Sequence, residues 1–219
     1  MTSIEVKVLK NILGANEQLA EKNRLLLEQN GVFALNLMSS PGAGKTSLIL
    51  ETIRRLKNTI KIGVIEGDIS SSVDAEAVGK EGVAVIQINT GGSCHLDANM
   101  VGNALNNLPL ADIDLLFIEN VGNLICPAGF ALGEHLKVIL SSIPEGDDKP
   151  LKYPVMFHEA DIVVLNKTDL LPYVKFDPDA FSWALKGINE KLEIIPVSCT
   201  TGQGLNEWIS WLTTQMRKG

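Results

Sequence analysis

The chain is predicted to fold as an α/β domain in which helices cover both faces of a mainly parallel β-sheet. The first observation is an alternation of short apolar runs with helical stretches along most of the sequence, which is typical of βαβ units. The second is size and composition. A chain of 219 residues, 45% hydrophobic and 21% charged, can bury one full core. We therefore expect residues 1–219 to form a single domain.

The first predicted element is a helix over about residues 4–29, which precedes the core of the domain. Its apolar residues recur at largely helical spacing, and Asn30-Gly31 is a typical helix stop. These apolar residues are Ile4, Val8, Ile12, Leu13, Leu19, Leu26 and Leu27. A strand at residues 32–38 follows, because this stretch is almost continuously apolar, as buried parallel strands are.

Beyond this strand, apolar runs indicate further strands, and the stretches between them have helical patterns. In chain order, we expect a helix at 45–57, a strand at 61–66, a helix at 73–80, a strand at 83–88, a helix at 96–108 and a strand at 114–119. The second half adds a helix around 134–142, a strand at 160–166, a helix at 178–191, a strand at 192–197 and a closing helix through Trp208 and Trp211, both expected in the core.

Residues 143–152 are predicted to form an exposed loop or a mobile flap, because they combine two prolines, a glycine and several charged residues. Residues 153–157, which follow, are a candidate for an extra strand. No internal repeat or low-complexity tract interrupts the alternation of strands and helices.

Charge and cysteine content exclude several classes of protein. The formal net charge is -7 and the pI about 5.0, which argues against nucleic-acid binding because phosphate backbones are bound by clustered Lys and Arg. The three cysteines, Cys94, Cys126 and Cys199, are too few and too scattered for a secreted disulfide framework. No apolar stretch approaches the length of a membrane span, and the first ten residues lack a signal-peptide pattern. A soluble, cytoplasmic protein is expected.

A phosphate-binding loop is predicted at residues 39–46, between the strand at 32–38 and the next helix. Ser39 stands where the usual pattern G-x-x-x-x-G-K-[ST] begins with Gly, but Gly44, Lys45 and Thr46 match it. We expect Lys45 to act in catalysis by placing positive charge on the β and γ phosphates, and Thr46 to ligate Mg²⁺. The residues expected to bind the nucleotide here are Ser40, Pro41, Gly42, Ala43, Gly44, Lys45, Thr46 and Ser47. The alternative is a Gly-rich turn before an ordinary helix.

A guanine-binding motif is predicted at Asn166-Lys167-Thr168-Asp169, which directly follows an apolar run and so lies at the carboxyl end of a predicted strand. It matches the N-K-x-D of GTPases. The carboxylate of Asp169 would accept two hydrogen bonds that guanine offers and adenine cannot, while the stem of Lys167 packs on the base; a kinase or ATPase is thereby disfavoured. Ser198 and Cys199 are expected to form a second base-contacting loop. Taken alone, N-K-T-D is an ordinary polar turn.

Carboxylates are predicted at the same edge of the sheet as the phosphate loop, since Asp68 and Glu119 lie at the ends of strands. Mg²⁺ prefers few carboxylates together with waters and phosphate oxygens, so we expect Asp68 and Glu119, with Thr46, to organise the ion or the attacking water. The N–H of Gly122 is expected to reach the γ-phosphate and sense hydrolysis. For Glu66 or Glu119, the alternative is a cap on the following turn. No residue pattern in the sequence indicates an arginine finger, so slow hydrolysis is expected.

A second metal site is suggested by Cys94 and His95, which stand side by side before a probable helix. A thiolate and an imidazole together suit Ni²⁺, Zn²⁺ or Cu, and Cys126 follows a nearby strand and could supply a third ligand. So few ligands make an open site, which favours metal exchange over structural zinc. The alternative is a buried cysteine and a solvent-exposed histidine without metal. His135 and His158 have no second ligand nearby in sequence and are interpreted as structural.

Taken in order, these motifs closely resemble those of the HypB family of hydrogenase nickel-incorporation GTPases, over nearly the whole chain. The matching stretches are residues 39–46, 66–68, 92–97, 119–127 and 166–169. The resemblance implies a P-loop NTPase fold of the dimerising SIMIBI class, so that residues 1–219 would be one GTPase domain. It also implies that Cys94, His95 and Cys126 correspond to the family's metal site between subunits, with Ni²⁺ or Zn²⁺ bound.

The resemblance further implies a homodimer controlled by GTP and Mg²⁺. Closure would bring the metal ligands of both chains together, and hydrolysis would reopen the dimer and pass on the metal. The implied partners are a nickel metallochaperone of the HypA type and the immature large subunit of a [NiFe] hydrogenase. The acidic charge and the lack of a long apolar stretch predict that neither nucleic acid nor a membrane is a partner. Residues 1–29 contain no Cys or His, so nickel storage by an N-terminal tail is not expected.

Two other functions remain open. A urease-maturation GTPase would look alike in fold, but its metal motif is Cys-Pro-His, whereas this chain has Cys94 directly followed by His95. A metal-binding protein that uses GTP only to assemble, without a catalytic requirement, would keep its role after Lys45→Ala.

Overall fold

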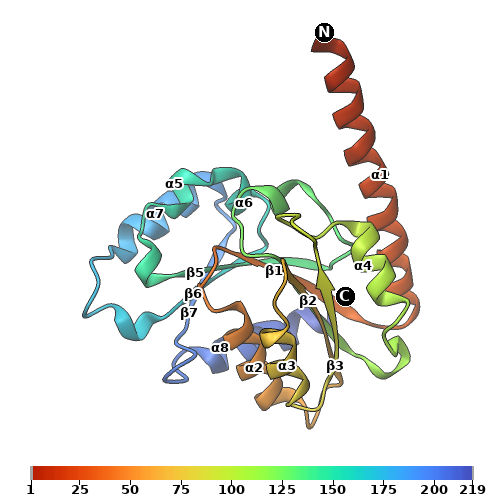
Figure 1. Ribbon diagram of the computed structural model, residues 1–219. Coiled ribbons are helices and arrows are strands. Elements are labelled where there is room, and N and C mark those ends of the chain that lie inside the picture. Colours follow the sequence, from red (N-terminus) through yellow and green to blue (C-terminus); the bar gives the residue numbers. More distant parts are fainter. Residues whose placement is uncertain (1, 219) are drawn as a thin grey trace.

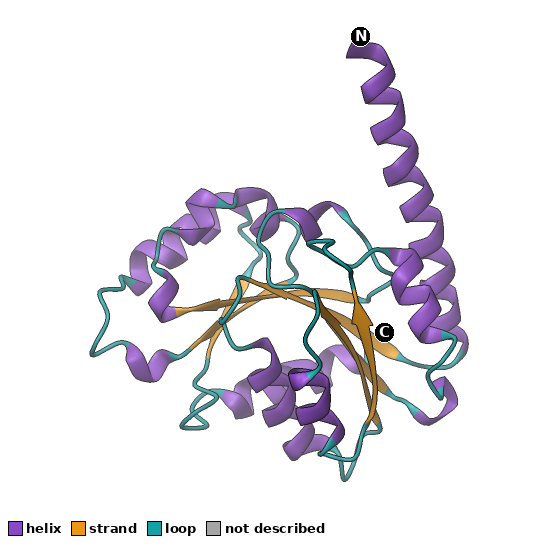
Figure 2. Ribbon diagram, in the orientation of Figure 1, coloured by secondary structure: helices purple, strands orange, loops and turns teal. Residues whose placement is uncertain are grey.

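The α/β expectation is confirmed by the structure, a computed structural model that describes the backbone of residues 2–218 and the side chains of residues 14–218. Within this range, a seven-stranded sheet has the order β3-β2-β4-β1-β5-β6-β7, and every neighbouring pair of strands is parallel. Helices cover both faces of the sheet (Figures 1 and 2).

Most predicted elements are confirmed to within a few residues at their ends. The strands are β1 (Phe33–Ser39), β2 (Ile62–Asp68), β3 (Ala84–Asn89), β4 (Leu115–Glu119), β5 (Leu136–Ser142), β6 (Ile162–Asn166) and β7 (Glu193–Pro196). The helices are α1 (Thr2–Gln29), α2 (Lys45–Leu56), α3 (Val73–Gly79), α4 (Ala98–Leu105), α5 (Lys149–Lys152), α6 (Pro154–His158), α7 (Pro178–Ile188) and α8 (Leu205–Met216).

The core consists of apolar layers between the sheet and the helices on each face. Helices α2, α3 and α8 cover one face, where Trp208 is fully buried and donates its indole N–H to Oγ1 of Thr52 at 2.9 Å. Trp211 is partly buried against the same layer. Helices α1 and α4 cover part of the other face, and α6 and α7 cover the rest (Figure 1). The expectation that both tryptophans belong to the core is confirmed for Trp208 and holds in part for Trp211.

The strand order places a crevice between β1 and β4. Strand β1 is buried along its whole length and pairs with β4 on one side and β5 on the other. The chain runs from β1 outward to β2 and returns through β4 to β5, so the direction of winding reverses between β1 and β4. Ligands of open α/β sheets bind at such a switch point, beyond the carboxyl ends of the strands. The predicted phosphate loop follows β1, and Glu119 ends β4.

The expected helix around residues 134–142 is wrong, because Leu136–Ser142 forms strand β5 between β1 and β6. Its consecutive apolar residues Val138, Ile139 and Leu140 are all fully buried. A helix on the surface of the sheet would bury only one stripe, whereas an inner parallel strand buries both of its faces. The run is too short for its periodicity to distinguish the two; the pairing on both sides decides it.

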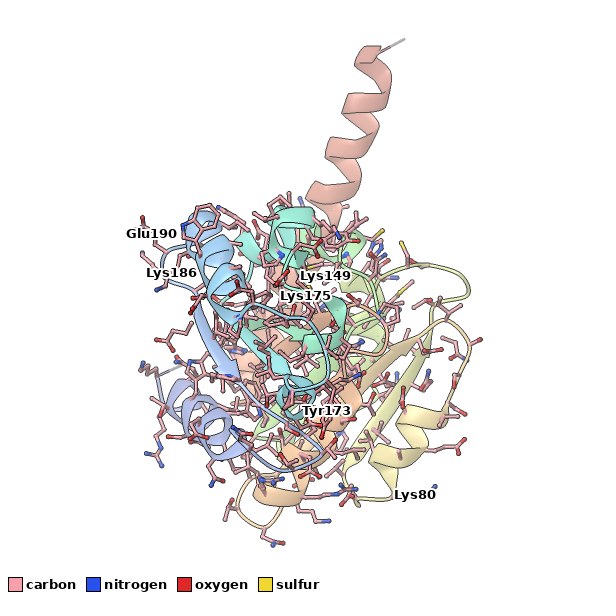
Figure 3. All side chains as sticks on the ribbon, turned by 90° about the vertical axis from the view of Figure 1, so that its left-hand side faces the viewer. Lys80, Lys149, Tyr173, Lys175, Lys186 and Glu190 are labelled. Atoms are coloured by element: carbon pink, nitrogen blue, oxygen red, sulfur yellow. The ribbon has the colours of Figure 1, made fainter. Side chains whose placement is uncertain are left out.

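The expected exposed loop or flap at residues 143–152 is also wrong. Ser142 and Glu145 form a capping box that begins a short 3-10 turn, and α5 follows with Pro150 buried in its first turn. Prolines therefore begin helical turns here instead of marking a loop. Lys149 lies on the face turned to the viewer in Figure 3, and Lys152 is exposed, while Pro150 between them is buried.

The extra strand considered at residues 153–157 is wrong as well, because Pro154–His158 forms α6. Met156 and Phe157 are buried in the layer between this helix and the sheet. The segment therefore covers a face of the sheet and does not extend its edge.

Helix α1 confirms the predicted N-terminal helix and ends, as expected, before Asn30-Gly31. Gly31 has a φ of 67°, the left-handed conformation that commonly follows a helix end. Four of the predicted apolar residues have side chains outside the described range: Ile4, Val8, Ile12 and Leu13. The N-terminal part of α1 projects away from the rest of the molecule (Figure 1). Among the described helices, none is both long and apolar enough to cross a membrane.

His135 serves the pairing of β1 with the segment that leads into β5. Its backbone N–H donates to the carbonyl of Ala34 at 2.7 Å, and its Nδ1 accepts the N–H of Ala34 at 3.0 Å. Burial, together with the positive charge of Arg24, lowers the pKa of His135 to about 4. The neutral imidazole of His135 therefore has a structural role, as the acceptor for the N–H of Ala34. His158 lies exposed at the end of α6.

We expect the free energy of unfolding to decrease as the pH falls from about 6.5 towards 4, in part because of His135. In this window the unfolded chain takes up a proton on the imidazole, whose ordinary pKa is 6.5, while the folded chain does not. Urea unfolding at pH 7 and pH 5 measures the effect. His135→Gln should show a smaller loss between the two pH values than the wild type, and the exposed control His158→Gln should match the wild type. Equal losses in all three proteins would contradict this role.

Candidate functional site

The loop between β1 and α2 has the backbone that its glycines predict. Gly42 and Gly44 have φ values of 78° and 103°, which L side chains rarely adopt. A Cβ atom at position 44 would also lie 2.4 Å from Nδ2 of Asn166. The glycine therefore lets this loop lie directly against the Asn166 loop, where Nδ2 of Asn166 donates to the carbonyl of Ala43 at 2.9 Å. Two motifs far apart in the sequence form one surface.

A cavity of about 490 Å³ opens beside this loop, at the switch point of the sheet. It collects predicted site residues from the carboxyl ends of β1, β2, β4 and β6. Those that line it are Pro41, Gly42, Gly44, Lys45, Thr46, Ser47, Asp68, Glu119, Gly122 and Lys167. Ser40 and Ala43 belong to the same loop, in which the N–H of Ala43 donates to the carbonyl of Ser40 at 3.4 Å.

Lys45 and Glu119 form a buried ion pair in this cavity. The Nζ of Lys45 lies 3.8 Å from Oε1 of Glu119 and donates to Oγ of Ser39 at 3.1 Å. The same carboxylate oxygen accepts the hydroxyl of Thr46 at 2.9 Å. Ser39, which departs from the usual pattern, thus holds the lysine that the pattern requires.

Glu66 lies in the site but is not among the ligands predicted from the sequence. It lies in register with Glu119 on the neighbouring strand β2 and is 2% exposed. Burial, followed by the charge of Glu119, raises the pKa of Glu66 to about 11. Burial also raises the pKa of Glu119, but the charge of Lys45 and the hydroxyl of Thr46 oppose this. The raised pKa of Glu66 favours its protonated form at neutral pH, whereas the charge of Lys45 favours the ionised form of Glu119.

The signal for Glu66 is present in the sequence. Glu66 and Glu119 each interrupt the end of an apolar strand, and neighbouring parallel strands bring such positions together. One Oε2 oxygen on each of these two carboxyl groups is buried without a hydrogen-bond partner. Buried acceptors of this kind, next to the Thr46 hydroxyl, fit the oxygen chemistry of Mg²⁺.

Asp68 also lines the cavity but is less buried than Glu66 and Glu119. One of its carboxylate oxygens accepts the N–H groups of Ser70 and Ser71 at 2.9 and 2.7 Å. These bonds lower the pKa of Asp68, so the group is ionised. The Asp68 carboxylate therefore lines the cavity, and its hydrogen bonds to the loop that leads to α3 hold it in place.

The predicted base-contacting residues form a second cluster, joined to the phosphate loop. The backbone of Lys167 has a φ of 62°, and its Nζ donates to the carbonyl of Gly42 at 2.7 Å. Oδ1 of Asp169 accepts the hydroxyl of Ser198 at 2.6 Å. The N–H of Cys199 donates to Oδ1 of Asn166 at 3.3 Å, and burial raises the pKa of the Cys199 thiol to about 11. The two loops predicted separately thus meet.

Cys94, His95 and Cys126 come together at a third cluster. Their ligand atoms all lie within 4.8 Å of one another, and Sγ of Cys94 is 3.7 Å from Nδ1 of His95. Cys94 and His95 lie in the loop between β3 and α4, whereas Cys126 begins a short 3-10 helix after β4. The proximity expected for Cys126 is confirmed within one chain.

The environment of this cluster keeps its ligands available to a metal. The ring of His95 packs on Phe130 with 4.1 Å between centroids, and burial lowers the pKa of His95. The nearby Cys126 thiol raises the pKa of Cys94. Without metal, the imidazole is thus neutral and the Cys94 thiol protonated near pH 7. A metal ion that binds here must displace the thiol proton.

The segment between Glu119 and Cys126 connects the cavity to this cluster. Gly122 lies against the phosphate loop, since a Cβ atom there would be 2.9 Å from Cα of Pro41. Asn123 donates from Nδ2 to the carbonyl of Cys94 at 3.3 Å and accepts the N–H of Ile125 at 2.8 Å. One short segment therefore contacts both sites.

Comparison with known proteins identifies close similarities. The family described as "CobW/HypB/UreG, nucleotide-binding domain" matches residues 33–196. The hydrogenase maturation factor HypB of Escherichia coli (strain K12) is 49% identical over 212 residues, which cover 97% of this chain and 72% of that protein.

Solved structures show the same likeness. HypB from Archaeoglobus fulgidus superposes with a TM-score of 0.87 at 44% identity, over 93% of this chain and 99% of that one. HypB from Helicobacter pylori in complex with nickel superposes with a TM-score of 0.89 at 36% identity, over 93% and 96%. The signal recognition particle receptor FtsY from Elizabethkingia anophelis, at 14% identity and a TM-score of 0.53, shares the fold.

Proposed function

Because this chain belongs to the HypB family of CobW/HypB/UreG nucleotide-binding proteins, we propose that it is a GTP-hydrolysing metallochaperone that assists nickel insertion into a [NiFe] hydrogenase. The observation that carries the proposal is the segment from Glu119 to Cys126. It ends in a carboxylate of the phosphate cavity on one side and in a cysteine of the metal cluster on the other. A nucleotide that moves this segment would change the metal ligands.

In the proposed reaction, GTP lies across the phosphate loop and the Asn166 loop. Asp169 recognises the guanine edge, the backbone of residues 40–47 binds the phosphates, and Lys45 neutralises charge that develops on the γ-phosphate. Mg²⁺ would supply a further positive charge at the phosphates, held by Thr46 and Glu119, with Asp68 positioning water. The buried Oε2 of Glu119, which has no hydrogen-bond partner among the described residues, supports this assignment.

Nickel is the proposed cargo, bound by Cys94, His95 and Cys126. Three ligands leave coordination positions open, which suits transfer better than storage. Zn²⁺ would compete for the same thiolates and imidazole. The structural relative from Helicobacter pylori, solved with nickel, supports this reading.

We further propose that GTP and Mg²⁺ bring two copies of the chain together with their Cys94 and Cys126 ligands facing each other. Hydrolysis would separate the copies and release the metal to an acceptor. A HypA-type metallochaperone and the hydrogenase large-subunit precursor are the proposed partners. The exposed side chains beside the two sites, Ile69 at 51% and Ile125 at 68% exposure, are suited to contact a second copy.

The test is the amount and affinity of nickel bound per chain, measured by equilibrium dialysis in thiol-reducing buffer. Addition of a non-hydrolysable GTP analogue with Mg²⁺ is expected to change nickel affinity, by a coupling free energy of about 1 to 3 kcal/mol. Cys126→Ser should lose most of the binding. The matched control Cys199→Ser, whose thiol lies in the base-binding loop, should keep it.

Two outcomes would overturn the proposal. Absence of nickel binding that depends on Cys94 and Cys126 would remove the cargo. Nickel binding that is indifferent to the nucleotide would separate the two sites and leave a metal-binding protein without a GTP-driven step.

A further inference from the structure

Helix α1 contacts the segments that flank the proposed metal site through two buried amide side chains, Asn16 and Asn23. Both are less than 8% exposed, at 7% and 6%. Oδ1 of Asn16 accepts the N–H of Ala98 at 2.9 Å, and its Nδ2 donates to the carbonyl of Ala131 at 2.8 Å. Nδ2 of Asn23 donates to the carbonyls of Ala98 and Leu132 at 2.7 and 2.9 Å. Each amide therefore bonds to two separate segments.

These two segments are the ones that lead away from the metal ligands. Ala98 begins α4, directly after the loop that carries Cys94 and His95. Ala131 and Leu132 follow the short 3-10 helix Cys126–Gly129. The same two amides thus fix the spacing between the loop that supplies Cys94 and His95 and the segment that supplies Cys126.

The contact is close because glycines on both segments admit the helix. A Cβ atom at Gly102 of α4 would lie 2.8 Å from Oδ1 of Asn23. A Cβ atom at Gly133 would lie 2.6 Å from Cβ of Asn23 and 2.9 Å from the carbonyl of Ala20. A side chain at Gly133 would meet backbone atoms of α1 and push the helix away, whereas one at Gly102 would displace the amide of Asn23.

We propose that Asn16 and Asn23 are positioning residues for the metal site, and that α1 acts as a brace that sets the distance between Cys126 and the Cys94-His95 pair. The inference rests on the proposed function, because it takes those three residues as the nickel ligands. Groups that hold ligands in place commonly change metal affinity by about 10- to 100-fold when they are removed. Among the described hydrogen bonds of the two amides, none goes to a residue that lines the phosphate cavity.

Variants without the Asn16 or Asn23 amide should still fold, because other hydrogen bonds hold the two segments. Oε2 of Glu134 still accepts the N–H of Leu132 at 2.7 Å, and Oδ1 of Asn120 still accepts the N–H of Leu96 at 3.0 Å. A third asparagine offers a matched control. Asn30, which directly follows the end of α1, is exposed, and among the described contacts its side chain bonds only to the carbonyl of Leu26.

The experiment compares Asn16→Ala, Asn23→Ala and Asn30→Ala with the wild type in the full chain. Nickel affinity is measured by competition, the thiolate-to-nickel charge-transfer absorption by titration, and GDP affinity with a fluorescent nucleotide. For Asn16→Ala and Asn23→Ala, we expect nickel affinity to fall about tenfold or more, with a changed charge-transfer spectrum and an unchanged GDP affinity. Asn30→Ala should behave as the wild type. Where Asn16→Ala does not fold, Asn16→Ser replaces it.

The outcomes separate this inference from the function on which it rests. If the wild type binds nickel through Cys94 and Cys126 but both amide variants keep its affinity and spectrum, the brace is refuted. If both variants lose nickel and GDP affinity together, the amides only support the fold, which also refutes it. If the wild type itself binds no nickel at these cysteines, the proposed function fails first.

Discussion

Replacing Asp169 by Asn is expected to lower the affinity for GTP by on the order of 10⁴-fold and to create binding of xanthosine triphosphate. In the proposed complex, the carboxylate accepts two N–H groups of guanine. An amide would turn a donor towards one of those donors and leave buried polar groups unpaired. Xanthine carries a carbonyl where guanine carries its amine, so the same amide can pair with it.

The local structure favours a clean exchange of specificity. Oδ1 of Asp169 already accepts the hydroxyl of Ser198 at 2.6 Å, and the carbonyl oxygen of Asn can accept the same bond. Lys167 and Asn166 hold the phosphate loop through their own contacts, to the carbonyls of Gly42 and Ala43. The substitution should therefore leave the loops in place and change only the atoms that face the base.

Competition between fluorescent and unlabelled nucleotides measures both affinities. Asp112→Asn is the matched control, since its carboxylate is exposed and pairs with Lys61 away from the cavity; it should bind GTP as the wild type does. A variant that still prefers GTP, or that loses both nucleotides equally, would show that Asp169 does not recognise the base.

Most of the fold could be predicted because its signals are local. The phosphate loop, the N-K-x-D stretch and the apolar strands before them lie together in the sequence, and the sheet places each at its carboxyl edge. Strand β5 could not be predicted in the same way. Val138 to Leu140 read equally well as a helix or a strand, and the choice is made by pairing with β1 and β6, which are distant in sequence.

In the candidate site, too, residues with a local sequence signal could be predicted and residues that depend on tertiary contacts could not. Cys94 and His95 are adjacent in sequence and could be recognised at once, whereas the partner of Glu119 required the register of two strands to identify Glu66. Asn16 and Asn23 are ordinary polar residues of an amphipathic helix until the fold brings Ala98 and Ala131 to them. Residues that act through tertiary contacts leave no motif.

Replacing Lys45 by Met is expected to lower the rate of GTP hydrolysis by about 10²- to 10³-fold, because a positive charge aimed at the developing phosphate charge is lost. Met keeps the length of the side chain, so the effect reports the charge. Phosphate release under saturating GTP and Mg²⁺ measures it. Lys61→Met, which removes an exposed lysine paired with Asp112, is the control and should hydrolyse GTP as the wild type does. A Lys45→Met variant with wild-type turnover would show that Lys45 does not act in hydrolysis.

The same substitution should change how stability depends on pH. Burial raises the pKa of Glu119 and the charge of Lys45 opposes that rise, so the variant should have a still higher pKa for Glu119 in the folded state. A carboxyl group whose pKa in the folded state lies above its ordinary value of 4.5 stabilises the fold fully below pH 4.5. This contribution is lost as the pH rises from 4.5 through the folded pKa. The free energy of unfolding of Lys45→Met should therefore fall more steeply between pH 5 and pH 8 than that of the wild type or Lys61→Met. If the unfolding free energies of the three proteins fall equally between pH 5 and pH 8, the charge of Lys45 does not control the pKa of Glu119. The assignment of the cavity's negative charge to Glu119, with Glu66 protonated, would then be wrong.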